Sequence, residues 1–134
     1  MKGFRSILYF NILNKLTFLS SKLKKRMAER NTDALIKIME KNDIKILTHP
    51  GDKVDVNIVR LAEACEKYGT ALEINSSHRN MTVDQIKLIK DRKVKVSVGS
   101  DAHDPLKIGN FDKAISRIEV AGLPLESLIN LLEK

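Results

Sequence analysis

Three short apolar runs alternate with helix-like segments after residue 30, and this order strongly limits the fold. The runs cover residues 44–48, 70–75 and 93–99. Each is followed by polar residues and then by a segment whose apolar positions recur at helical spacing. An order of strand, helix, strand, helix, strand predicts parallel strands joined by right-handed crossovers. We therefore predict an α/β chain built from parallel βα units.

Local signals set the predicted ends of the helices. Gly69 suits the left-handed position that ends a helix. Thr82 and Gln85 have the spacing of a capping box, and Asn31 to Asp33 offers N-cap side chains. The predicted helices cover about residues 31–41, 55–68, 82–91, 110–121 and 124–133.

Side chains that bind metals follow two of the predicted strands. Asp101 and His103 follow the run over residues 93–99, and His49 follows the run over residues 44–48. In an extended backbone, residues two apart point to the same side, so Asp101 and His103 are expected to converge. Parallel strands end at a common edge, where α/β folds place their sites. The sequence thus predicts a divalent metal site. In the alternative, Asp101 caps the next helix, His103 is a loop residue, and His49 is a turn residue stacked beside Pro50.

The positive charge of the chain lies in its first 30 residues. The net charge is +7, and residues 1–30 hold eight basic residues and one acidic residue. Residues 31–134 are balanced, so we expect no nucleic-acid binding by this part. Apolar residues from Phe4 to Met27 recur at helical spacing and predict a basic amphipathic helix. That helix would pack on the rest of the protein or contact an anionic membrane surface.

The single cysteine bears on the cellular compartment. Cys65 lies on the apolar face of a predicted helix, and no second cysteine is present to form a disulfide within the chain. This usage is typical of a reducing compartment, so a cytoplasmic location and a buried, unreactive thiol are predicted.

Three segments together resemble successive motifs of the PHP family, which is named for DNA polymerases and histidinol phosphatases. They are Ile46 to Asp52, Ala71 to His78, and Val98 to His103. The resemblance covers residues 31–134 and leaves residues 1–30 as a segment outside it. It implies a distorted (β/α)7 TIM-like barrel, of which this chain would form the C-terminal part, preceded by the extra N-terminal helix.

The resemblance also implies an activity and roles for individual residues. PHP proteins are hydrolases that cleave phosphoesters with water activated by a divalent metal such as Zn, Mn or Fe. By motif, His49, Asp101 and His103 would be metal ligands, while Glu73 and Asn75 would support the site. His78 and Arg79 lie on a loop that would approach the phosphate of a small phosphorylated substrate.

The chain also departs from the family pattern. The family's first strand carries a His-x-His pair, and its further His and Glu ligands have no counterpart here, where the histidines are His49, His78 and His103. We therefore expect a PHP phosphatase lacking its N-terminal half. The alternative is a non-catalytic PHP remnant that acts as a binding or oligomerisation module. Self-association is expected in either case, because missing barrel strands leave unpaired sheet edges.

Overall fold

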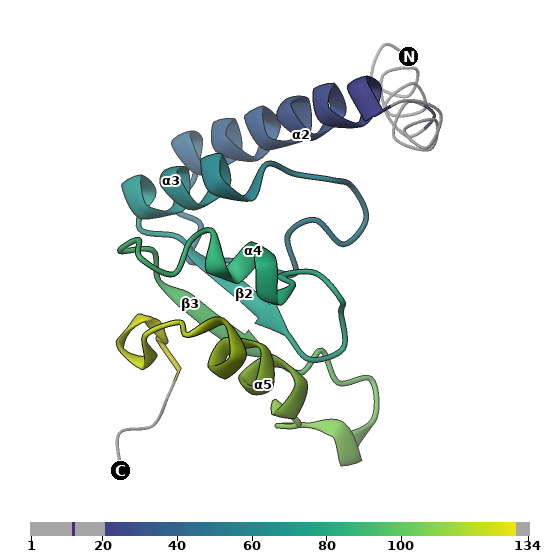
Figure 1. The fold of residues 1–134 in the computed structure, drawn as a ribbon, viewed down its shortest axis with the longest axis vertical. Coiled ribbons are helices and arrows are strands. Elements are labelled where there is room, and N and C mark those ends of the chain that lie inside the picture. Colours follow the sequence, from purple (N-terminus) through teal and green to yellow (C-terminus); the bar gives the residue numbers. More distant parts are fainter. Residues whose placement is uncertain (1–11, 13–20, 131–134) are drawn as a thin grey trace.

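The computed structural model describes residue 12 and residues 21–130 of the chain, arranged around a short parallel sheet (Figure 1). The sheet has the order β1-β2-β3, formed by Ile46–Leu47, Ala71–Asn75 and Val96–Gly99. Leu72 pairs with Leu47 on one side and with Val96 on the other. Both pairings are parallel, so the predicted α/β architecture is confirmed. A three-stranded sheet is what the described residues form.

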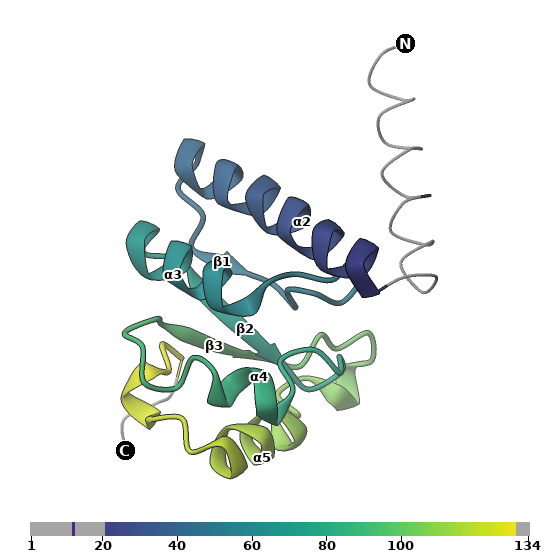
Figure 2. The ribbon, with the colours of Figure 1, turned by 45° about the horizontal axis from the view of Figure 1, so that its top comes forward.

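The helices lie in two pairs about the sheet. Helices α2 (Ser21–Lys41) and α3 (Ile58–Tyr68) pack together next to β1 and β2. Helices α4 (Val83–Lys87) and α5 (Asp112–Ala121) pack together on the side of β3 (Figure 2). Within the described residues, no helix has the length and apolar character needed to cross a bilayer.

Alternation along the strands separates the core from the opposite face of the sheet. Leu72 and Ile74 on β2 are completely buried and belong to one apolar cluster with residues of α3, α4 and α5. Glu73, between them, points to the opposite face and is partly exposed. The cluster also contains these largely buried side chains: Leu61, Cys65, Ile86, Ile89, Val94, Val96, Val98, Ala114 and Ile118.

Two predicted local signals are confirmed. Thr82 and Gln85 form the complete capping box that starts α4. Gly69, at φ 70°, ends α3 in the left-handed conformation. Asn57 caps the start of α3 by accepting a hydrogen bond from the Arg60 N–H.

Residues 31–33 do not begin a helix, because α2 runs continuously from Ser21 to Lys41. The Asn31 side chain instead donates to the Asp55 carbonyl, and the Thr32 hydroxyl accepts from the Asn57 N–H, both at 2.8 Å. These polar side chains attach α2 to the segment before α3. Apart from its last ten residues and residue 12, the segment 1–30 lies outside the described residues, and with it most of the predicted amphipathic helix.

The predicted helix over residues 124–133 is wrong over its described part. Only Leu125–Ser127 form a short 3-10 helix, after which the chain runs along the free side of β3. The Ile129 N–H donates to the Val96 carbonyl at 2.9 Å. The Asn130 side chain donates to the Val98 carbonyl at 2.8 Å and accepts from the Val98 N–H at 3.0 Å. Residues 128–130 therefore satisfy part of the β3 edge.

Candidate metal centre

Histidine and aspartate side chains gather where the three strands end. His49 follows β1, His78 follows β2 and Asp101 follows β3. Since the strands are parallel, their carboxyl ends meet at one edge of the sheet. Asp52 joins the group from the turn after His49, in which the Asp52 N–H donates to the His49 carbonyl at 3.2 Å.

His78 lies at the centre of this group, between two carboxylates. Its Nδ1 is 2.9 Å from Asp52 Oδ1, and its Nε2 is 2.7 Å from Asp101 Oδ2. The hydrogen bonds to Asp101 and then to Asp52 raise the pKa of His78 above its usual value. The hydrogen bond from His78 in turn lowers the pKa of Asp101. The arrangement fixes the orientation of the ring.

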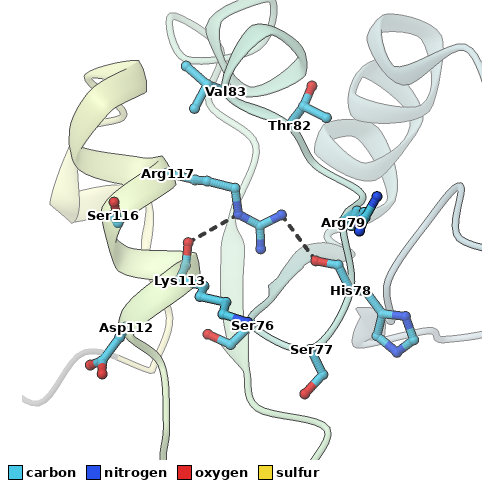
Figure 3. Close-up of a pocket in the computed structure, with 10 residues that line it drawn as sticks. All are labelled: Ser76, Ser77, His78, Arg79, Thr82, Val83, Asp112, Lys113, Ser116 and Arg117. Atoms are coloured by element: carbon cyan, nitrogen blue, oxygen red, sulfur yellow. Dashed lines mark hydrogen bonds between the residues drawn. The ribbon is translucent and has the colours of Figure 1, made fainter.

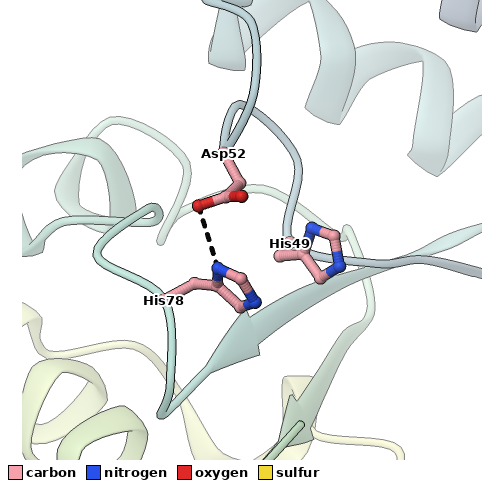
Figure 4. A group of neighbouring side chains, drawn as sticks. All are labelled: His49, Asp52 and His78. Carbon is pink, nitrogen blue, oxygen red and sulfur yellow. Dashed lines mark hydrogen bonds and ion pairs between the residues drawn. The ribbon is translucent and has the colours of Figure 1, made fainter.

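His49 packs against His78, and both rings lie close to Asp52 (Figure 4). The ring centroids are 4.4 Å apart, and the planes are tilted by 31°. One donor atom each of His49, Asp52 and His78 lies within 4.8 Å of the others, which suits them to hold a metal ion. Two imidazole nitrogens and a carboxylate oxygen form a donor set accepted by Zn, Mn and Fe ions.

The predicted ligands occupy different places around this group. Asp101 joins it directly through His78, whose hydrogen bond is the main cause of the lowered pKa of Asp101. His103 lies at the outer edge, with Nε2 3.7 Å from Asp101 Oδ2 and a side chain that is 90% exposed. The structure thus brings Asp101 into contact with His78 and leaves His103 at the outer edge of the group.

The backbone differs from the extended geometry predicted for residues 101–103. Asp101 has φ 43° and His49 has φ 27°, both on the left-handed side that residues with a Cβ rarely adopt. Such conformations persist where the surrounding structure enforces them, and they are frequent at functional sites. Two of the three non-glycine residues with positive φ among the described residues therefore carry side chains of the candidate centre.

Residues of β2 hold the loops of the centre in place. The Glu73 carboxylate accepts a hydrogen bond from the His49 N–H at 2.7 Å. Asn75, which is buried, accepts from the Ser77 N–H at 2.8 Å and so shapes the loop before His78. Both contacts agree with the supporting role that the family resemblance implied.

Sequence reasoning missed Asp52 and gave His78 a different role. The signal for Asp52 was the turn-forming stretch from His49 to Gly51, which returns the chain toward the histidine. His78 was expected near a phosphate together with Arg79, whereas the structure places its ring between Asp52 and Asp101. Arg79 is exposed and borders a cavity beside α5.

Comparisons with known proteins relate the chain to phosphatases. It is 36% identical to a probable phosphatase of Shewanella frigidimarina, over 76% of this chain and 45% of the relative. A probable phosphatase of Caldanaerobacter subterraneus is 37% identical over 76% of this chain and 44% of the relative. The probable phosphatase YcdX of Escherichia fergusonii is 32% identical over 75% of this chain and 45% of the relative. No family model matches the chain.

These similarities agree with the phosphatase resemblance predicted from the motifs. The chain is a homologue of proteins named probable phosphatases. It spans less than half the length of the curated relatives it matches.

Proposed function

We propose that this chain belongs to a PHP-type, metal-dependent phosphatase and carries part of its metal centre. The observation that supports this most directly is the meeting of His49, Asp52, His78 and Asp101 at the carboxyl edge of the sheet. The names of the relatives supply the reaction class, hydrolysis of a phosphoester. A cytoplasmic location, in keeping with the free Cys65 thiol, is part of the proposal.

The chemistry of the donors fits the proposed metal. The motifs favour His49, Asp101 and His103 as ligands. Asp52 and His78 offer further donor atoms close to that of His49. A divalent ion held there would polarise a phosphoryl oxygen and lower the pKa of a water molecule toward about 7. Carboxylates from two loops offset the charge of the ion, and Glu73 keeps the His49 backbone in position.

His78 has a defined proton role in this arrangement. With both ring nitrogens facing carboxylates, the folded protein favours the imidazolium form of His78, in which both nitrogens carry a proton. An ion bound to His78 would require a neutral nitrogen, so the proton on that nitrogen would leave. An ion bound instead by His49, Asp101 and His103 would leave His78 as a donor to Asp52.

Metal content is the test of the proposal. The purified full chain is stripped with a chelator, reloaded with Zn²⁺ or Mn²⁺, and assayed for bound metal and for hydrolysis of p-nitrophenyl phosphate. We expect bound metal in the wild type and a large loss of affinity in His49→Ala and Asp101→Ala. Comparing His78→Ala with His103→Ala shows which imidazole completes the ligand set.

Asp43→Asn is the matched control, since Asp43 is an exposed carboxylate paired with Lys45. It should bind metal like the wild type. A wild-type chain that is folded but takes up neither metal would contradict the proposal. Metal uptake without hydrolysis would favour the alternative of a binding module.

A further inference from the structure

A cavity of about 580 Å³ lies between the loop after β2 and the first turns of α5 (Figure 3). Its volume is in the range of small-molecule sites. The side chains of Arg79, Lys113 and Arg117 line it, together with the hydroxyl groups of Ser76 and Ser77. One carboxylate, that of Asp112, also borders it, so cations outnumber anions in the wall.

Arg117 is fixed in this wall by main-chain carbonyl groups. Its guanidinium donates to the carbonyls of Asn80 at 2.8 Å and His78 at 3.2 Å, and also to that of Asn75. Its Nε donates to the Lys113 carbonyl at 3.1 Å. Burial lowers the pKa of Arg117, but a guanidinium remains charged at neutral pH. No carboxylate within residues 21–130 forms an ion pair with it, so no neighbouring acid neutralises this charge in the wall of the cavity.

A second cavity, of about 400 Å³, adjoins the first. The two share Ser76, Ser77 and Lys113, and the second adds Ser100 and Lys107. No acidic side chain of the described residues lines the second cavity. Lys107 and Lys113 form no ion pair in this part of the chain either, so both ammonium groups are available to a ligand.

Both cavities adjoin the candidate metal centre. His78 belongs to the wall of the first, and Ser100, in the wall of the second, directly precedes Asp101. The Ser77 hydroxyl donates to the Ser100 carbonyl at 2.5 Å and joins the two loops. The centre is rich in carboxylates, whereas the cavities are rich in cations. The two neighbouring regions therefore favour ligand groups of opposite charge.

We propose that the cavities form a metal-independent subsite for a second phosphate group of the substrate. The substrate class would be a small phosphoester that carries another phosphate beyond the bond to be cleaved. Arg79 and Lys113 would contact this group, because guanidinium and ammonium donors form strong charge-assisted hydrogen bonds with phosphate oxygens. This assignment of substrate class rests on the proposed phosphatase function, whereas anion binding by the cavities does not.

Inorganic phosphate is the probe for the subsite. It is titrated into the full-length chain in the presence of EDTA and at constant ionic strength, and binding is followed by ¹H–¹⁵N NMR. We expect saturable shifts confined to amides of residues 76–80, 100–107 and 112–117. Arg79→Ala and Lys113→Ala should each weaken binding about fivefold, as expected for loss of one exposed charge-assisted contact.

Lys41→Ala is the matched control, because Lys41 is an exposed lysine at the end of α2, away from both cavities. It should leave phosphate binding unchanged. An absence of saturable shifts would overturn the proposal, as would an equal response to acetate or equal weakening by Lys41→Ala.

Kinetic measurements with two substrates test this inference separately from the proposed function. With metal-loaded protein, we expect Lys113→Ala to raise the KM for a three-carbon diol bisphosphate about fivefold, with little effect on the KM for p-nitrophenyl phosphate. Equal KM changes for both substrates would contradict the proposed substrate class but would not contradict the proposed phosphatase function. If the chain binds phosphate in EDTA but hydrolyses neither compound, the proposed phosphatase function is contradicted and the proposed anion-binding subsite is supported.

Discussion

The Glu73 carboxylate occupies the space that a side chain at Gly99 would need. A Cβ built on Gly99 would lie 2.0 Å from Glu73 Oε1, and the other carboxylate oxygen of Glu73 accepts the hydrogen bond from the His49 N–H. Because Gly99 on β3 has no side chain, Glu73 on β2 can reach the His49 N–H in the loop after β1. This relationship connects all three strands to the candidate metal centre.

Gly99→Ala should move the Glu73 carboxylate away from His49. Because residues that orient metal ligands commonly contribute tenfold or more to affinity, we expect metal affinity to fall about tenfold. The free energy of unfolding should fall by about 1–3 kcal/mol, the usual cost of overpacking. Calorimetric metal titration and thermal unfolding measure the two effects. In the Gly99→Ala background, Glu73→Ala should cause little further loss of affinity, and additive losses would contradict the coupling.

How much of this arrangement could be predicted from sequence differs between the strands and the site. The apolar runs that contain β2 and β3, together with Gly69 and the Thr82 capping box, act locally and were sufficient to predict the parallel order. Residues 124–130 were misassigned because Leu125 and Leu128 have a spacing that fits a helix. Their position is decided instead by hydrogen bonds to β3, about 30 residues away in the chain.

The site was predicted in part for a similar reason. Strand order alone located His49 and Asp101 at one edge. The position of the His78 ring depends on contacts with Asp52 and Asp101, 26 and 23 residues away. Such contacts leave no periodic pattern in a sequence.

Glu29→Gln should change how the free energy of unfolding depends on pH in the acidic range. Hydrogen bonds from Asn57 and then Arg60 lower the pKa of Glu29 below its usual value. The unfolded chain then takes up this proton at a higher pH than the folded protein. The stabilisation is complete above the unfolded pKa, near 4.5, and is lost as the pH falls through the folded pKa. Urea unfolding at several pH values should show a wild-type advantage that shrinks on acidification, and a constant difference would argue against the shifted pKa.

Cys65 should resist thiol reagents in the native protein. Its side chain is completely buried, and this burial raises the pKa of the thiol to about 12. Reaction requires the thiolate, so labelling with a chromogenic disulfide at neutral pH should be slow and should become rapid in denaturant. Rapid labelling of the metal-free native chain would show that α3 opens easily.

Asn130→Ala should expose the β3 edge. The variant loses both hydrogen bonds to Val98, which should cost about 1–2 kcal/mol of stability. Free strand edges pair with other chains, so sedimentation should also detect more self-association than in the wild type. Asn42→Ala, which removes one exposed hydrogen bond at the end of α2, is the control for both measurements. An unchanged sedimentation profile in Asn130→Ala would mean that this edge does not govern association.

The position of Arg117 has a consequence for how the protein opens. The carbonyl groups that it holds, from Asn75 to Asn80, span the whole loop that carries His78, whereas Arg117 itself belongs to α5. Amide hydrogens of that loop and of α5 should then exchange with solvent as one cooperative unit, so that local melting of α5 would release the His78 loop at the same time.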